Sequence, residues 1–205
     1  MATAKNRFTA LPLTEERCIT PDQPIGNVVI LIGSPGSGKS AITRMGLLNV
    51  DNIDHVTPDK WVEILARHRK ADLSDPRQTA GLHLHVSPLY RKHKETSISL
   101  SARSNFVFET TGKRLEGLKH IIIISRQANM RVVLVYVSVS LKTAHHGNSS
   151  RSRRVPRHVV GISHDAAETN FNAAIPLADE AWKVDNDTRP GYTQVRTSAF
   201  IKRIK

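Results

Sequence analysis

The stretch V-V-I-L-I-G-S-P-G-S-G-K-S, residues 28–40, decides the fold of this chain. It opens with five apolar residues, Val28 to Ile32, a run that is too short to span a membrane and rich in β-branched side chains. Such a run is typical of a strand that is buried on both faces. The run ends at Gly33, where the spacing G-x-x-x-x-G-K-[ST] begins. The stretch therefore predicts a central strand followed by a tight glycine-rich turn.

This turn has the composition of a phosphate-binding loop. Its glycines let successive backbone N–H groups face one concave site, and a helix starting after the turn adds partial positive charge. We expect Lys39 to reach the β- and γ-phosphates of ATP and the Ser40 hydroxyl to ligate Mg²⁺. A chance match is the alternative, but strand, loop and helical pattern follow one another in the order that binding requires. The residues expected to hold the nucleotide are Gly33, Ser34, Pro35, Gly36, Ser37, Gly38, Lys39 and Ser40.

Length and composition predict a single domain in a cytoplasmic protein. The chain has 205 residues, enough for a single α/β domain with a substantial core. A single cysteine, Cys18, excludes an internal disulfide and fits a reducing compartment. No apolar run approaches the roughly 20 residues of a membrane span, and the first residues lack the core of a signal peptide. We therefore expect a cytoplasmic protein without a membrane segment.

The net charge of +12 is larger than an ATP site requires, and it is distributed unevenly. Residues 118–164 contain no Asp or Glu but include eight of the chain's Lys and Arg residues, and residues 188–205 are again purely basic. Such asymmetry favours a polyanionic partner, most simply nucleic acid. A basic surface without a specific partner is the equal alternative. The eight basic residues are Lys119, Arg126, Arg131, Lys142, Arg151, Arg153, Arg154 and Arg157.

Beyond the loop, buried-strand patterns alternate with helical patterns. Strands are predicted at 27–32, 52–57, 105–109, 131–139 and 181–184. Helices are predicted at 38–48, from Pro58 onward with Thr57 as the cap, and at 87–104, 114–128 and 157–173. This alternation predicts an α/β protein, a three-layer P-loop NTPase fold with a mostly parallel five-stranded sheet.

The same patterns suggest three parts. Residues 1–26 contain three prolines and no sustained period, so we expect an irregular N-terminal extension. Residues 27–187 form the P-loop domain, in which the polar, Arg-rich segment at about 140–156 is expected to be a small lid over the phosphates. Residues 188–205 are expected to be a basic C-terminal tail.

Asp59 is the candidate for the group that activates the acceptor. It lies just past the second predicted strand, on the side of the sheet toward which the γ-phosphate would point. Phosphoryl transfer to a hydroxyl needs a carboxylate there to orient the hydroxyl and accept its proton. The alternative is an acidic residue that only stabilises the first turn of its helix. With the loop assigned, we favour the catalytic role.

Glu109 ends the third predicted strand beside the loop. Ligands of open α/β sheets bind outside the carboxyl ends of the strands, so this position is suited to a Mg²⁺-bound water or to the substrate. A solvated glutamate at a strand end is the alternative. Thr110 and Thr111 follow directly and would add hydroxyl groups to the same substrate site.

Four arginines follow the fourth predicted strand, where a lid would close over the nucleotide. A planar guanidinium pairs well with the charge that spreads over the γ-phosphate oxygens during transfer. We expect one or two of the four to act on phosphates and the others to lie on the surface. Spacing alone does not distinguish Arg151, Arg153, Arg154 and Arg157.

In their order along the chain, these segments resemble the P-loop kinases of the zeta-toxin and polynucleotide-kinase group. The segments are G-S-P-G-S-G-K-S, T-P-D-K-W, N-F-V-F-E-T-T-G-K and R-S-R-R-V-P, and the resemblance covers about residues 27–187. It implies that Asp59 is the base, that Trp61 takes an aromatic position, and that Arg151 and Arg154 correspond approximately to lid arginines acting in catalysis with Lys39. Thr110 stands where zeta toxins have a glycine.

Three functions follow from the residues and the resemblance. The leading one is an ATP- and Mg²⁺-dependent kinase whose acceptor hydroxyl belongs to nucleic acid, because the basic charge pattern suits the related kinases that act on 5′-hydroxyl ends or on 5-hydroxymethyluracil in viral DNA. The second is a kinase of a small metabolite or nucleotide sugar, as zeta toxins are. The third is a non-catalytic nucleotide-binding subunit of a nucleoprotein assembly.

Overall fold

A computed structural model describes residues 26–44, 53–100, 105–187 and 200–203 of the chain. The strands and helices follow one another as β1(Asn27–Ile32), α1(Lys39–Arg44), β2(Ile53–Val56), α2(Pro58–Arg69), α3(Pro76–Leu100), β3(Asn105–Thr110), α4(Leu115–Gln127), β4(Arg131–Ser138), α5(Leu141–Ser149), α6(Arg157–Ala174), the short 3-10 helix η1(Ile175–Leu177), β5(Glu180–Asp185) and β6(Phe200–Arg203). All five predicted strands are present, within two residues of their predicted ends.

The strands form one sheet in the order β2-β3-β1-β4-β5-β6. The first five are parallel, as the alternation of strands and helices predicted, and β6 pairs antiparallel with β5. The prediction of five strands was therefore one short, because four residues of the segment expected to be a basic tail extend the sheet. The rest of that tail, the predicted extension at 1–25 and the predicted helical residues 45–48 lie outside the described residues.

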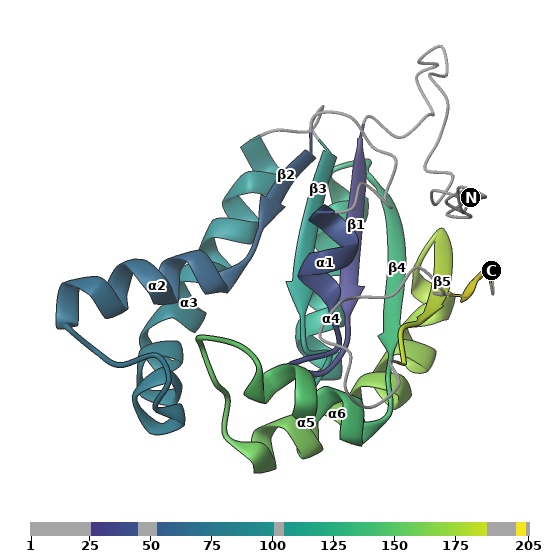
Figure 1. Cartoon of the computed structure of the whole chain (residues 1–205). Helices are drawn as coiled ribbons and strands as arrows, with labels where there is room; N and C mark the ends of the chain where they lie inside the picture. Colours follow the sequence, from purple (N-terminus) through teal and green to yellow (C-terminus); the bar gives the residue numbers. More distant parts are fainter. Residues whose placement is uncertain (1–25, 45–52, 101–104, 188–199, 204–205) are drawn as a thin grey trace, which may run out of the picture.

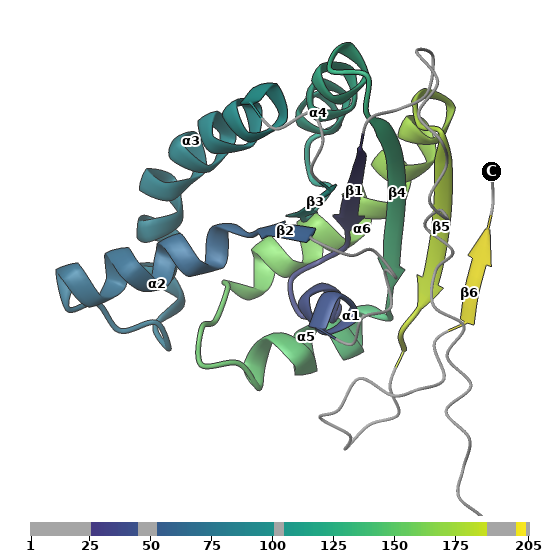
Figure 2. The same cartoon turned by 90° about the horizontal axis from the view of Figure 1, so that it is seen from above.

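Alternate residues of β1 face two different hydrophobic layers. Val28, Ile30 and Ile32 pack in a core shared with α2, α3, α4 and α6. Val29 and Leu31 pack on the opposite face with Ile42 of α1. Because every one of these strand side chains is buried, the continuous apolar run fits a strand covered on both sides. Figures 1 and 2 show the resulting layers, with α1 on one face of the sheet and α4 and α6 on the other.

Helices α2 and α3 form an arm that projects to one side of the sheet (Figures 1 and 2). The sequence predicted a helix that starts at Ser87, but α3 begins at Pro76 and continues through Pro88. The buried residues Leu82, Val86 and Tyr90 recur every four positions across the proline. Packing of this continuous apolar stripe outweighs the backbone hydrogen bond that proline cannot make.

The predicted lid contains ordered secondary structure. Its first part is helix α5, capped by the Ser140 side chain, which accepts a hydrogen bond from the Thr143 backbone. Residues 150–156 then connect α5 to α6 and carry the arginines; we call this segment the arginine loop. Across the part of the chain that the structure describes, no helix is long and apolar enough to cross a membrane.

Candidate active site

The phosphate-binding loop joins β1 to α1 at the carboxyl edge of the sheet. Gly36 and Gly38 have φ values of +83° and +90°, in the left-handed region that favours glycine. Lys39 folds back over the loop, and its Nζ donates hydrogen bonds to the carbonyl oxygens of Gly33 at 2.7 Å and Ser34 at 2.9 Å. Burial lowers the pKa of Lys39 to about 8, although the nearby Glu109 carboxylate opposes that shift.

Two segments that follow later in the sequence contact the phosphate-binding loop and support its conformation. The Asn186 side chain, just after β5, donates a hydrogen bond of 2.9 Å to the Ser37 carbonyl. Helix α5 packs backbone to backbone against the loop: a Cβ added at Gly147 would lie 2.4 Å from the Gly36 carbonyl oxygen, and one added at Gly36 would lie 2.1 Å from that of Ala144. Glycine is required at both positions for this close approach.

Ser40 and Glu109 meet beside the loop. The Ser40 hydroxyl donates a hydrogen bond of 2.9 Å to Oε2 of Glu109, which the parallel pairing of β1 and β3 places alongside. Glu109 is buried, and the Tyr90 hydroxyl of α3 donates to its backbone carbonyl at 3.1 Å. A hydroxyl and a carboxylate at the end of a phosphate-binding loop form the donor set that suits Mg²⁺, completed by phosphate oxygens and waters. These residues therefore fit the expected metal.

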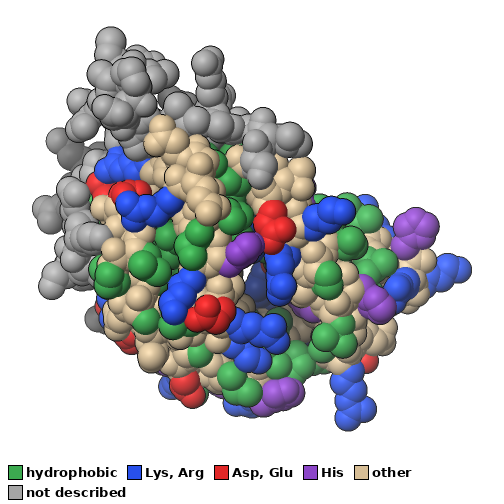
Figure 3. Space-filling view, turned by 180° about the vertical axis from the view of Figure 1, so that it is seen from behind, with side chains coloured by type: hydrophobic (Ala, Val, Ile, Leu, Met, Phe, Trp, Pro, Cys, Tyr) green, Lys and Arg blue, Asp and Glu red, His purple; other side chains and the backbone are tan. Residues whose placement is uncertain are grey.

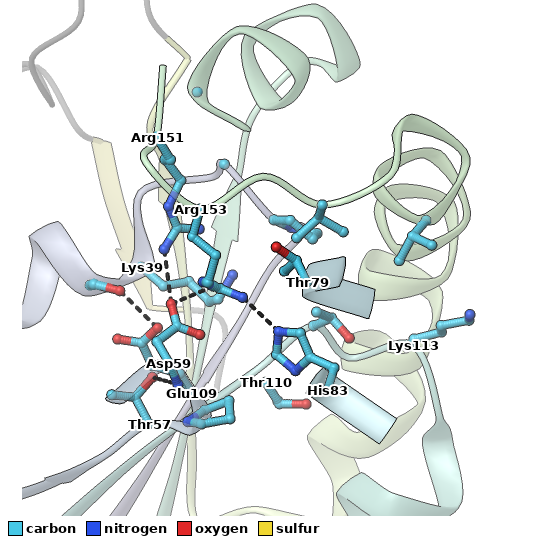
Figure 4. A pocket seen from close by; sticks show the side chains of 18 of the residues that line it. Lys39, Thr57, Asp59, Thr79, His83, Glu109, Thr110, Lys113, Arg151 and Arg153 are labelled. Atoms are coloured by element: carbon cyan, nitrogen blue, oxygen red, sulfur yellow. Dashed lines mark hydrogen bonds and ion pairs between the residues drawn. The ribbon is translucent and has the colours of Figure 1, made fainter. Parts of the chain in front are cut away.

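Asp59 lies in the first turn of α2, as predicted. The Thr57 side chain caps this helix by accepting a hydrogen bond from the Asp59 backbone, and Pro58 takes the first helical position. Oδ2 of Asp59 contacts Arg151 Nη2 at 2.9 Å and Arg153 Nη2 at 2.5 Å (Figure 4). Burial raises the pKa of Asp59, but Arg153 and then Arg151 outweigh burial and hold the pKa below its usual value.

The structure brings a different pair of arginines to the site than the one expected from the resemblance. Arg151 is at Asp59, but Arg154 is exposed and absent from the cavity wall, while its backbone N–H donates to the Leu73 carbonyl at 3.1 Å. Arg153 takes the inward position, with 8% of its side chain exposed. In a loop without regular dihedral angles, spacing does not determine which side chain points inward, so the sequence could not show that Arg153 rather than Arg154 lies at the cavity.

One residue at the site was not predicted from the sequence. His83 of α3 lines the same cavity, and its Nε2 lies 2.6 Å from Nη1 of Arg153 (Figure 4). In the sequence, His83 and His85 have no Asp or Glu within four positions of His83 to support a functional role, and the segment around them was expected to precede a helix. The helical period of Leu82, Val86 and Tyr90 was the available signal.

These groups line a cavity of about 570 Å³ between the loop, the arm and the arginine loop. Thr110 and Thr111 lie at its wall, as predicted, next to Lys113. The Thr110 hydroxyl accepts a hydrogen bond of 3.3 Å from the backbone N–H of Gly112. Apolar residues also line it, namely Ala80, Leu84, Val155, Pro156 and Val159. The cavity thus combines a phosphate site with apolar wall residues, and its volume is in the range that small ligands occupy.

The acid-free basic stretch does not form one free cationic surface. Five of its eight basic residues pair with acids from other places in the chain: Lys119 with Glu116, Arg126 with Asp179, Arg131 with Glu180, and Arg151 and Arg153 with Asp59. The face in Figure 3 shows Lys and Arg side chains in several small groups, some of them around a hollow, with acidic side chains between.

The sequence profile of the Zeta toxin family matches residues 12–198. This match includes the loop, Asp59, Glu109 and the arginine loop. The chain belongs to the Zeta toxin family. The phosphate-binding loop described above lies inside the matched range. No curated protein matches the sequence.

Solved structures share the fold. A chain of the native AvrRxo1-ORF1:-ORF2 complex has a TM-score of 0.63 at 18% identity, and a chain of the PezAT toxin-antitoxin system of Streptococcus pneumoniae has 0.60 at 13%. Each match covers 80% of this chain, and 55% and 67% of the other chain respectively. A chain of the Pnkp1/Rnl/Hen1 RNA repair complex has 0.53 at 16%, covering 72% and 46%. This chain thus spans about half the length of two of the three, and the likeness concerns the fold.

Proposed function

We propose that this Zeta toxin family member is a kinase that transfers the γ-phosphoryl group of ATP to a hydroxyl group, with Asp59 as the general base. A single observation carries the proposal. Both arginine contacts of Asp59 are made to Oδ2, and among the described residues no hydrogen bond is made to Oδ1. One carboxylate oxygen is held in place by the arginines, and we infer that the other is available to orient an incoming hydroxyl.

The other residues of the site have matching roles in this proposal. Lys39 and the backbone N–H groups of the loop bind the phosphates, and Arg151 and Arg153 stabilise the charge that develops on the transferred group. Ser40 and Glu109 would hold Mg²⁺, which supplies further neutralisation of phosphate charge when it is bound. Arg154 has no part in this assignment, because Arg153 takes the inward position. A structure of AvrRxo1-ORF1:-ORF2 with ATP is among the similar folds, which supports ATP as the nucleotide.

For the acceptor we propose a nucleotide unit of nucleic acid, in line with the net charge of +12. The cavity restricts which unit this is. The whole cavity, including the part that ATP phosphates would fill, is about 570 Å³, so at most a terminal nucleotide or a base turned out of the stack can enter it, and a length of duplex cannot. We therefore expect activity on strand ends, on single strands or on extruded bases.

A small acceptor such as a nucleotide sugar is the second candidate, and a specific observation favours it. Five of the eight cations in the acid-free stretch are engaged with carboxylates, so less charge is available for a polymer than the sequence indicates. The apolar wall around Leu84 and Val159 suits a ring of a small ligand equally well.

Transfer of ³²P from γ-labelled ATP to a panel of acceptors distinguishes these proposals. The panel contains 5′-hydroxyl DNA and RNA strands, DNA with hydroxymethylated bases, and nucleotide sugars. Label on a polymer, with a rate that falls steeply as salt increases, supports the first acceptor class, because polymer binding releases counterions. Label on the nucleotide sugars supports the second. If ATP binds but is transferred to no acceptor, the chain is instead a non-catalytic nucleotide-binding subunit.

A further inference from the structure

Among the described residues, Arg153 is the hydrogen-bond partner of the His83 ring. The histidine comes from α3, outside the phosphate-binding loop and both strand ends that carry the carboxylates. Its Nε2 lies 2.6 Å from Nη1 of Arg153. In Figure 4 the imidazole points toward this guanidinium from the side opposite Asp59. Arg153 is therefore held at two ends, by a carboxylate and by an imidazole.

The contact defines the protonation state of His83. A guanidinium has only N–H donors, so Nε2 must be the acceptor and the proton of the neutral ring must lie on Nδ1. A charged imidazole at this distance would place two cations together. Burial lowers the pKa of His83 and the charge of Arg153 lowers it further, against an opposing effect of Asp59, so both effects favour the neutral ring.

His83 contacts Arg153 from a regular helix, α3. The Ser87 hydroxyl donates to the His83 carbonyl at 2.7 Å, within the helix. The arginine loop is tied to the same arm a second time, where the Arg154 backbone N–H donates to the Leu73 carbonyl at 3.1 Å. A side chain in a loop loses rotamer entropy when it is held in one position. For Arg153, the contacts from the arm offset this loss.

We propose that His83 is a positioning residue that fixes the Arg153 guanidinium between Asp59 and the phosphate site. This inference rests on the proposed kinase activity. The imidazole occupies the Nη1 side, so the remaining N–H groups of Arg153 stay directed at Oδ2 of Asp59 and at the transferred phosphoryl group. Without His83, the buried guanidinium loses an acceptor and turns toward other partners.

Three variants test the role by kinetics. In His83→Leu we expect kcat to fall by up to about 100-fold with little change in the KM for ATP, the loss expected when a reacting group shifts by about 1 Å. His83→Gln keeps an acceptor atom and should restore most of that loss. His85→Leu changes an exposed histidine two residues away, outside the cavity wall, and serves as the matched control. A Gln variant as slow as the Leu variant overturns the proposal.

A double-mutant cycle shows whether His83 acts through Arg153. In the Arg153→Met background, His83→Leu should cause no further loss of kcat, because residues that act as one unit are not additive. Independent losses that multiply would mean that His83 acts by another route.

A measurement without any acceptor separates this inference from the proposed function. We expect ¹⁵N NMR of the wild-type chain to show His83 as the Nδ1–H tautomer, and this signature to be lost in Arg153→Met. A tautomer that does not respond to Arg153→Met overturns the contact itself. If wild-type protein phosphorylates nothing, the kinase proposal fails while the NMR result still decides the His83–Arg153 pairing.

Discussion

Nη2 of Arg153 lies 2.5 Å from Oδ2 of Asp59. The residue proposed as the base is thus joined to a residue proposed to bind the phosphoryl group before any substrate is present. The pair holds the carboxylate ionised and oriented, and it gives the guanidinium a partner until phosphate oxygens compete for it. The general base and the phosphate contacts at this site are consequently coupled.

Replacement of Asp59 by Asn should abolish transfer and leave ATP binding intact. The amide cannot accept the hydroxyl proton, so we expect kcat to fall by about 10² to 10⁴, the usual contribution of a general base. Removal of a negative charge next to the phosphates should keep or increase the affinity for a non-hydrolysable ATP analogue, measured by calorimetry. Turnover equal to wild type would exclude Asp59 as the base.

Arg153→Met should move the titration of Asp59 to higher pH. The two arginines hold the Asp59 pKa below the ordinary value, with Arg153 the stronger effect, while burial acts in the opposite direction. In wild type the carboxylate should therefore stay ionised to below about pH 3.9, the ordinary aspartate pKa. Loss of Arg153 leaves burial opposed mainly by Arg151, so the pKa must rise. Carboxyl ¹³C NMR measures both titrations, and identical midpoints would contradict the coupling.

The affinity for ATP should fall as the pH rises through about 8. Burial lowers the pKa of Lys39 to about 8, so the ammonium is lost above that pH and its attraction for phosphate with it. Calorimetry in buffers of different ionisation enthalpy should detect proton uptake on binding near pH 8. Lys39→Arg, which stays charged, should bind without proton uptake. Uptake that persists in the Arg variant would assign the titration to another group.

Ser40→Ala should raise the Mg²⁺ concentration needed for ATP turnover. The hydroxyl is 2.9 Å from Oε2 of Glu109, and the two oxygens are the proposed protein side of the metal site. Glu109→Gln should act in the same direction. Ser149→Ala, at an exposed position on α5, is the control. Titration of activity against Mg²⁺ gives the comparison, and equal midpoints for Ser40→Ala and wild type would exclude the hydroxyl as a ligand.

Gly147→Ala should weaken ATP binding by displacing α5 from the phosphate-binding loop. The new Cβ would lie 2.4 Å from the Gly36 carbonyl oxygen, and overpacking of this kind costs about 1–3 kcal/mol. Gly161→Ala on α6 is a matched control, because a Cβ there meets nothing within 4 Å and should stabilise the helix slightly. The unfolding temperatures of the two variants should shift in opposite directions, and only Gly147→Ala should lose affinity for nucleotide. Unchanged ATP affinity in Gly147→Ala would show that α5 does not support the loop.

The sequence was sufficient for the parts of the site that belong to regular elements. The loop is encoded locally by Gly36, Gly38 and the strand before it, and Asp59 and Glu109 lie at strand ends that parallel pairing brings together. Their positions required only the strand boundaries and the rule that parallel strands share a carboxyl edge.

Contacts between segments that are distant in the sequence could not be predicted from strand boundaries and local patterns. The inward turn of Arg153 and its contact with His83 depend on how the arginine loop meets the arm. The paired arginines of the acid-free stretch find their carboxylates far away in sequence, as Arg131 does with Glu180. The course of α3 through Pro88 likewise depends on tertiary packing, which a local rule for proline omits.

Strand β6 has a consequence for how the protein is handled. It lies at the end of the sheet opposite β2 and pairs along Trp182–Asp185 of β5. Without residues 200–203, the outer backbone N–H and C=O groups of β5 would have no strand partner there, and an open edge is a template for pairing with another polypeptide. Shortened versions of this chain are therefore expected to self-associate, and purification tags are better placed at the N-terminus.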